Sequence, residues 1–259
     1  VAQAPEREGL VILEALPAAP AEPPENALSA LRRGREQLDA ADSRDELLRF
    51  AAAEIRLLSG FDRVLVHQLL PDENEAILAE ARNERLPSLL DRRQCAGTAS
   101  AALRAKLKIA GRRVIPDINY KPARLFGRSL PPENLPDLDR CLLQSVPPAC
   151  LESLRRAGVQ ASLSLSIMVE GELWGLISCH NTQPVRPDYT LLEKCDHLVA
   201  FLGEQLGRRQ RQEAEELRFR VNTASSRLLG RLVNEDLPEE SLLSAGPELL
   251  DILPADGVG

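Results

Sequence analysis

Three serines alternate with aliphatic residues in one short stretch of the chain. Ser162, Ser164 and Ser166 are each separated by one leucine, the spacing of two that places side chains of one kind on one face of a β-strand. The chain turns at Gly171 and returns through an apolar run that ends at His180, which predicts an antiparallel hairpin. A buried hydroxyl without a partner costs roughly 1–3 kcal/mol, so a face of hydroxyls lines a ligand cavity or a satisfied polar network. We interpret this hairpin as part of a ligand-facing sheet.

The register of this hairpin decides whether the serines and the histidine can act together. A two-residue turn at Glu170-Gly171 would pair Ala161 with His180 and leave the serines on the opposite face. A β-bulge near Gly175 would bring Ser162 and His180 onto one face. A common site for both therefore requires a bulge at that point.

No catalytic constellation emerges from the remaining reactive residues. The three histidines are scattered along the chain, and no nucleophile elbow, phosphate loop or metal-ligand spacing occurs. We expect His67 and His197 to have structural roles. The sequence given is therefore not expected to be an enzyme by itself, and any catalytic output would lie downstream.

The cysteines are five in number and contain no CxxC pair, which favours a reducing compartment over a disulfide framework. We expect Cys141, Cys179 and Cys195 to be small buried hydrophobes. Cys95 and Cys150 lie among polar or proline-rich residues, and for each an inert thiol and a redox-active or attachment thiol remain open.

Composition limits the classes of partner. The chain has 259 residues and a net charge of -7, and its arginines are dispersed among acidic residues, which argues against nucleic-acid binding. No apolar run approaches the ~20 residues of a membrane span. The chain starts at Val1 without a methionine or a signal-peptide pattern, so we expect a cytoplasmic location and interpret the sequence as part of a longer protein.

The pattern of elements predicts an α+β fold, an antiparallel sheet with flanking helices. Ser43 and Glu46 form a capping box for a helix that Gly60 closes. The other expected elements are helices at 26–40, 98–110, 138–146 and 148–157, strands at 9–14, 61–69, 76–81 and 112–118, a linker at 17–24 and a long loop at 119–137.

A long helix is expected from residue 188 to about residue 234. Its narrow apolar stripe and charged flanks are typical of a coiled-coil or bundle element, so we interpret it as a spine that pairs with a second copy of the chain. Residues 249–254 then resemble the first strand of a following domain.

Four blocks of sequence resemble those of a known protein family in residue type as well as in pattern. Residues 61–66, 113–117, 143–152 and 174–180 keep their order and spacing over residues 26–210, and together they resemble the chromophore-binding GAF domain of bacterial phytochromes. The flanks resemble the end of a preceding PAS domain and the start of a following PHY domain. The resemblance implies four parts: the PAS end and linker at 1–24, the GAF domain at 25–207, the spine helix at 208–238 and the PHY start at 239–259.

Members of this family hold a linear tetrapyrrole, biliverdin in the bacterial group, and use light to switch an attached output such as a histidine kinase of a two-component system. The resemblance implies that Arg113 pairs with one propionate, that Ser162 and Ser164 bond the other, and that His180 bonds the ring D carbonyl. A guanidinium and hydroxyls suit a carboxylate, and an imidazole can donate to a carbonyl.

The chain departs from the family pattern at five pocket positions, one of which is Ser153 in place of an aromatic residue. Thr98 begins the segment that replaces the Asp-Ile-Pro motif, Gln144 replaces the second propionate arginine, Cys150 replaces a histidine stacked near rings B and C, and His67 replaces a tyrosine. The attachment cysteine of bacterial members belongs to a segment that would precede Val1.

These departures leave three functions open. The first is a photosensory module that binds biliverdin through the retained half of the pocket. The second is a bilin-free GAF sensor or dimerisation module, in which thiols such as Cys150 respond to redox change. The third is a GAF domain for another small ligand.

Overall fold

The computed structural model describes residues 2–3, 11–12, 14, 24–70, 74–90, 93–94, 101–122, 141–142 and 145–234. The chain divides into two compact units, Val1–Gln205 and Leu206–Gly259. The described elements are β1 (Ala2–Gln3), β2 (Val11–Ile12), α1 (Pro24–Asp39), α2 (Arg44–Ser59), β3 (Arg63–Leu69), β4 (Glu75–Arg82), β5 (Arg93–Gln94), α3 (Ala101–Ala110), β6 (Arg112–Ile115), α4 (Pro148–Arg156), β7 (Ala161–Val169), β8 (Glu172–Asn181) and α5 (Tyr189–Asn234).

A six-stranded sheet forms the centre of the first unit, with strand order β5-β4-β3-β8-β7-β6. Every neighbouring pair of strands in it is antiparallel. The short strands β1 and β2 pair separately, so the predicted strand at the start of the chain is confirmed over Val11–Ile12. The α+β class is confirmed.

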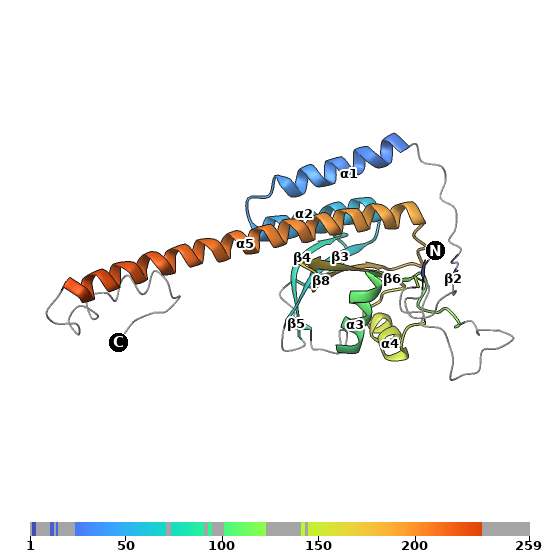
Figure 1. Cartoon of the computed structure of the whole chain (residues 1–259). Helices are drawn as coiled ribbons and strands as arrows, with labels where there is room; N and C mark the ends of the chain where they lie inside the picture. Colours follow the sequence, from blue (N-terminus) through green and yellow to red (C-terminus); the bar gives the residue numbers. More distant parts are fainter. Residues whose placement is uncertain are drawn as a thin grey trace. The chain divides into compact units, whose positions relative to one another are not determined.

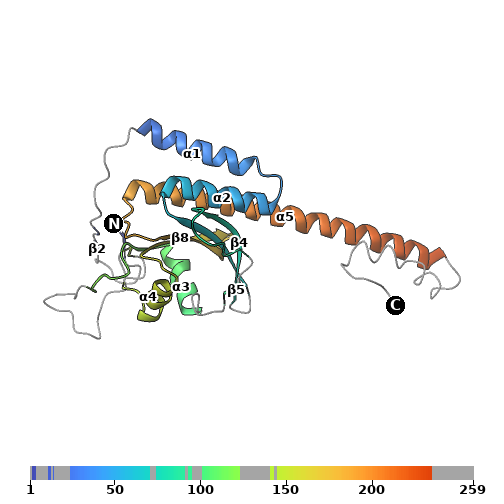
Figure 2. The same ribbon diagram turned by 180° about the vertical axis from the view of Figure 1, so that it is seen from behind.

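Helices cover both faces of this sheet. Figures 1 and 2 show α1, α2 and the first part of α5 on one face, and α3 and α4 on the other. The face toward α2 and α5 is lined by buried aliphatic residues such as Val64, Leu163 and Ile177, which pack in one core with Ile55 and Leu202. The second face of the sheet carries both polar and aliphatic side chains.

The start and end of α2 follow the predicted signals. The backbone N–H of Glu46 donates to Ser43 Oγ at 3.2 Å, and the Glu46 carboxylate accepts from the N–H of Asp42 at 2.9 Å. Gly60 ends the helix with φ of 69°, in the left-handed region that favours glycine.

Two expected boundaries differ from the structure. The predicted strand at 112–118 ends at Ile115, because the following Pro116 has no N–H to donate to the ladder. The predicted helix at 138–146 is wrong for the described residues 141–142 and 145–146, which are not helical. Pro147 disfavours a helical backbone conformation at the preceding Val146. The N–H of Val146 donates instead to Tyr120 Oη at 2.7 Å.

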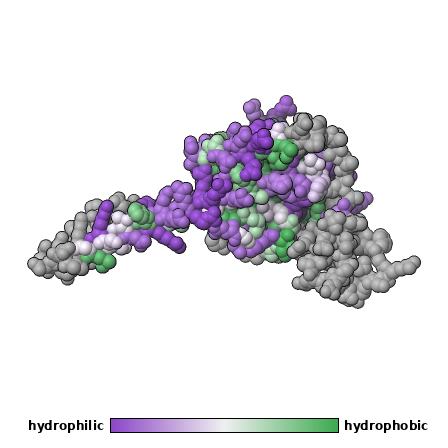
Figure 3. Space-filling view, turned by 45° about the horizontal axis from the view of Figure 1, so that its top comes forward, coloured by the Kyte–Doolittle hydropathy of each residue, from purple (hydrophilic) through white to green (hydrophobic). Residues whose placement is uncertain are grey.

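The long helix is confirmed as α5, Tyr189–Asn234. In the first unit it buries Leu192, Cys195, Val199 and Leu202, whereas Leu217 and Phe219 in the second unit are 43% and 74% exposed. Most of the described surface in Figure 3 is hydrophilic, with scattered hydrophobic patches. Among the described helices, none is long and apolar enough to cross a membrane.

Candidate ligand-binding site

The face of the sheet away from α2 and α5 carries three rows of side chains, because directly paired residues on neighbouring strands share a face. The first row contains Arg63, His180, Ser162 and Ile115; the second contains Leu65, Ser178, Ser164 and Arg113; and the third contains His67, Leu176 and Ser166. We call this the polar face. It brings together five of the predicted site residues, namely His67, Arg113, Ser162, Ser164 and His180.

A β-bulge in β8 produces this register, as predicted. Met168 pairs with Leu173, but Ile167 pairs with Gly175, so Trp174 is the extra residue. Ser162 consequently pairs with His180. Gly175 is required here because a Cβ atom would overlap the carbonyl oxygen of His67 on β3.

The three serines of β7 are not equivalent. Ser166 Oγ donates to the carbonyl oxygen of Leu107 at 2.8 Å and so ties the strand to α3. Ser162 and Ser164 are only 4% and 6% exposed, and neither hydroxyl has a hydrogen-bond partner among the described residues. These two hydroxyls are the ones available to a ligand.

Arg113 lies on the polar face beside Ser164. Its guanidinium is partly buried, with Nη2 4.0 Å from Cys150 Sγ and a buried Nε that has no hydrogen-bond partner in the described part of the chain. The neighbouring Arg112 extends to the opposite side, where it forms ion pairs with Glu193 at 3.2 Å and with Asp196 on α5. Arg113 is therefore placed to bind an anion on the polar face, whereas Arg112 stabilises the packing of β6 against α5 through its ion pairs.

His180 is neutral at ordinary pH. Burial lowers its pKa to about 3, and the charges of His67 and Arg63 act in the same direction. A neutral imidazole offers one N–H donor and one acceptor nitrogen, which suits a carbonyl or an N–H group of a ligand.

His67 forms a buried pair that the sequence did not predict. It is 4% exposed, and its Nδ1 lies 3.2 Å from Oε2 of Glu75, which is 3% exposed. Glu75 follows the turn between β3 and β4, so only the pairing of these two strands brings the carboxylate to the imidazole.

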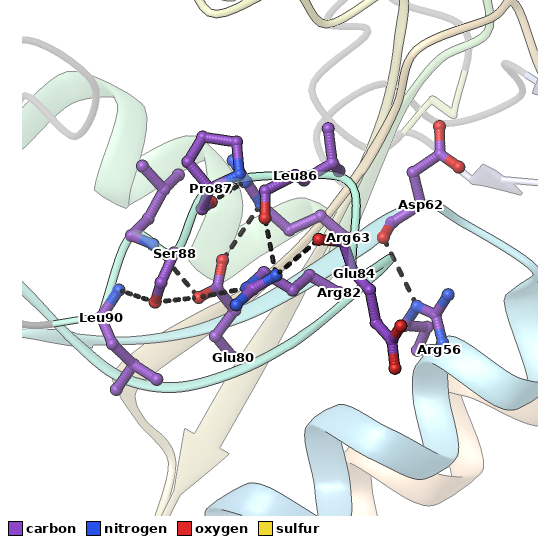
Figure 4. A network of polar contacts seen from close by, with 11 residues as sticks. Arg56, Asp62, Arg63, Glu80, Arg82, Glu84, Leu86, Pro87, Ser88 and Leu90 are labelled. Atoms are coloured by element: carbon purple, nitrogen blue, oxygen red, sulfur yellow. Dashed lines mark hydrogen bonds and ion pairs between the residues drawn. The ribbon is translucent and has the colours of Figure 1, made fainter.

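A second buried carboxylate anchors the edge of the polar face, as Figure 4 shows. Glu80 on β4 pairs with Arg63 at 3.1 Å and with Arg82 at 3.6 Å, and it accepts from Ser88 Oγ at 2.6 Å. Arg63 also donates to the carbonyl oxygen of Pro87. This network holds the segment 83–90 against β4.

The remaining candidate residues divide by exposure. Cys150, near the start of α4, is partly exposed, whereas Cys141, Cys179 and Cys195 are buried as predicted. Burial raises the pKa of Cys195 to about 12 and also raises that of Cys179. Thr98, Gln144 and Cys95 lie outside the described residues. The described part of the chain contains no group of three or more metal-ligating side chains.

Residues 43–209 match the GAF domain family. The chain belongs to this family. Its GAF domain is of the kind found in phytochrome photosensory modules: the chain is 30% identical over 222 residues to cyanobacterial phytochrome B of Nostoc sp. and 33% identical over 209 residues to a bacteriophytochrome of Xanthomonas campestris. These alignments cover 85% and 80% of the chain but 30% and 33% of the relatives, so the chain spans about a third of their length.

Solved structures of bacteriophytochromes have the same fold. The photosensory core module of the Stigmatella aurantiaca phytochrome aligns with a TM-score of 0.80 and 33% identity, covering 93% of this chain and 48% of that one. A bacteriophytochrome of R. palustris aligns with a TM-score of 0.79 and 30% identity, covering 97% of this chain and 48% of that one. A shorter Stigmatella aurantiaca structure, described as a chromophore-binding domain, has a TM-score of 0.67 and 36% identity, covering 72% of this chain and 61% of that one.

Proposed function

We propose that this GAF domain is the bilin-binding photosensory module of a bacteriophytochrome-like signalling receptor, with biliverdin as its ligand. The observation that carries the proposal is a pair of buried serines, Ser162 and Ser164, whose hydroxyls have no partners among the described residues. They share a face of the sheet with Arg113, which pairs directly with Ser164. Two hydroxyls and a guanidinium on one face suit carboxylates. The relatives and the solved structures named above support the choice of a tetrapyrrole over other dianions.

Each residue of the polar face has a distinct proposed role. Arg113 binds one propionate of biliverdin, and Ser162 and Ser164 donate to the other. His180, which is neutral, donates to the carbonyl of ring D. When bound, the pigment absorbs light and isomerises, and the protein residues orient it and exclude water.

The larger arrangement is part of the same proposal. Residues 1–24 end a PAS-like domain, 25–207 form the GAF domain, 208–238 form the spine helix and 239–259 begin a PHY domain. The spine mediates a homodimer in the cytoplasm, and the output is a sensor histidine kinase that signals to a response regulator. The exposed apolar side chains of Leu217 and Phe219 on α5 support a dimer contact along this helix.

Coexpression with a biliverdin source tests the proposal. We expect a far-red absorption band that changes reversibly on illumination. Arg113→Gln should weaken pigment binding by about 10–100-fold, because a charge-assisted hydrogen bond contributes roughly 1.5–3 kcal/mol. Arg112→Gln is the matched control, since its side chain pairs with α5 on the opposite face and its loss should leave pigment binding unchanged. Colourless wild-type protein, or equal loss in both variants, would refute the proposal.

One observation favours a second function, a thiol-responsive module without a pigment. The partly exposed Cys150 lies 4.0 Å from the guanidinium of Arg113, and a nearby cation favours the reactive thiolate. In this case the apoprotein would change its oligomeric state on treatment with a thiol oxidant such as diamide. Cys150→Ser would abolish that response, and an oxidant-independent oligomeric state would exclude this function.

A further inference from the structure

Cys150 differs from the other described cysteines in its contact with the polar face. Its Sγ lies 4.0 Å from Nη2 of Arg113, and its side chain packs against the hydrophobic cluster that contains Ile115. Arg113 and Ile115 are the residues of β6 that extend two rows of the polar face, beside Ser164 and Ser162. Cys150 therefore lies over this end of the polar face and is partly exposed, whereas the other described cysteines are buried, namely Cys141, Cys179 and Cys195.

The contact between Cys150 and Arg113 leaves room for one more atom. A charge-assisted N–H···O hydrogen bond spans about 2.7–2.9 Å, whereas the Sγ–Nη2 distance is 4.0 Å. An oxygen atom bonded to Sγ would fit between the two groups and accept a hydrogen bond from the guanidinium. No carboxylate of the described residues pairs with Arg113, and its buried Nε has no hydrogen-bond partner among them. The guanidinium is therefore able to bind an oxygen atom added to the sulfur.

We propose that Cys150 is a site of reversible oxidation by hydrogen peroxide, and that the oxidised side chain binds the guanidinium of Arg113 in competition with a ligand carboxylate. The thiolate sulfur attacks one peroxide oxygen, so an S–O bond forms as the O–O bond breaks. The departing hydroxide takes up the proton that the thiol released and leaves as water. The sulfur loses two electrons and the peroxide gains them, and the product is a sulfenic acid.

Arg113 contributes to this chemistry twice. During the attack, negative charge develops on the departing oxygen, and a guanidinium beside the sulfur stabilises that charge. Afterwards Arg113 donates a hydrogen bond to the sulfenic oxygen, and this bond competes with the one to a ligand carboxylate. The inference rests on the proposed function and deepens it, because peroxide becomes a second signal that regulates the same anion site. Unlike the thiol-responsive function considered above, it requires no change of oligomeric state.

The first test uses the ligand-free protein. Hydrogen peroxide is added, the sulfenic acid is trapped with dimedone, and the labelled peptides are measured by mass spectrometry. Cys150 should be labelled, and Arg113→Gln should slow its labelling by about 5–10-fold, because the charge on the departing oxygen loses its partner. Arg112→Gln is the matched control and should label at the wild-type rate, since Arg112 pairs with α5 on the opposite side. An unlabelled Cys150, or equal rates in Arg113→Gln and wild type, would overturn the proposal.

The second test measures biliverdin affinity before and after treatment with peroxide. Oxidation should raise the dissociation constant by about 10-fold, the low end of the loss expected for Arg113→Gln, because Ser162 and Ser164 still bind the ligand. Dithiothreitol should reverse the change, and Cys150→Ser should not respond to peroxide. Cys150→Asp, which places an anion beside Arg113, should bind about 10-fold more weakly than Cys150→Asn, its uncharged control of the same size.

The two tests separate this proposal from the proposed function. If reduced wild-type protein binds biliverdin and oxidation of Cys150 leaves the affinity unchanged, the inference fails and the proposed function stands. If reduced wild-type protein binds no biliverdin, the proposed function fails, and the labelling rates of Cys150 in Arg113→Gln and Arg112→Gln alone decide whether the thiol and the guanidinium form an oxidation site.

Discussion

Replacement of Gly175 by alanine tests how the bulge in β8 builds the binding site. A Cβ atom at this position would overlap the carbonyl oxygen of His67, with the carbonyl carbon of the same residue at 3.3 Å. Because both atoms belong to the backbone of β3, no side chain can rotate away. The two strands must part by on the order of 1 Å, which costs roughly 2–4 kcal/mol in strain and weakened ladder bonds.

The assay is thermal unfolding followed by circular dichroism. At 2–4 °C per kcal/mol for a domain of this size, the Gly175→Ala variant should melt about 5–15 °C below wild type. Gly230→Ala is the matched control, because Gly230 is helical and a methyl group added there would meet no atom within 4 Å, so alanine should stabilise by up to about 1 kcal/mol. Even below its melting temperature, Gly175→Ala should bind biliverdin weakly, since the strand shift moves His180 relative to Ser162. A variant that melts within a degree of wild type would refute the packing argument.

Three further predictions concern single side chains. Ser164→Ala should weaken biliverdin binding and change the unfolding free energy by less than about 0.5 kcal/mol. Ser166→Ala loses a buried hydrogen bond, so it should lower the unfolding free energy by about 1 kcal/mol and leave biliverdin binding unchanged. Urea titrations measure the first quantity and pigment titrations the second. The pKa of His180 is about 3 in the folded chain and 6.5 in the unfolded chain, so protonation stabilises the unfolded state as the pH falls below about 6.5. In urea titrations, this protonation should lower the unfolding free energy of wild type by up to ~1.4 kcal/mol per pH unit, and His180→Gln should lack that decrease. The same pH dependence in both proteins would contradict the assignment. Iodoacetamide should alkylate Cys150 in the native protein and spare Cys179, whose pKa burial raises, and mass spectrometry that finds equal labelling would contradict this.

The features that the sequence predicted well depend on local chemistry. Alternation of serine and leucine placed β7, the capping box and Gly60 bounded α2, and periodic apolar residues extended α5 to its observed length. The bulge was predicted by combining the family resemblance, which implies that Ser162 and His180 face one ligand, with a two-residue turn, which alone would place them on opposite faces.

The features that the sequence did not reveal depend on strand register and distant contacts. The antiparallel pairing of β3 with β4 was expected, but the pairs His67–Glu75 and Arg63–Glu80 depend on the register of these strands, which shifts between Val66 and His67. The distinction between Ser166 and its two neighbours likewise depends on a carbonyl of α3 that lies far away in sequence. The expected helix at 138–146 failed for the same reason, since a distant tyrosine hydroxyl takes the N–H of Val146.

The polar face is costly for the fold, and this cost itself points to function. A strand such as β7 would gain stability from valine at positions 162 and 164, because aliphatic side chains pack well on a buried sheet surface and need no partner. Ser162 and Ser164 are buried instead, and their hydroxyls have no partners among the described residues, so these side chains contribute less to stability than aliphatic ones would. Polar residues of this kind persist where a ligand forms hydrogen bonds with them. The ligand-free protein is then less stable than it could be, and ligand binding recovers this stability. By this reasoning, a ligand that fills the polar face should stabilise the chain by more than the same ligand bound elsewhere, since it also removes these unsatisfied groups.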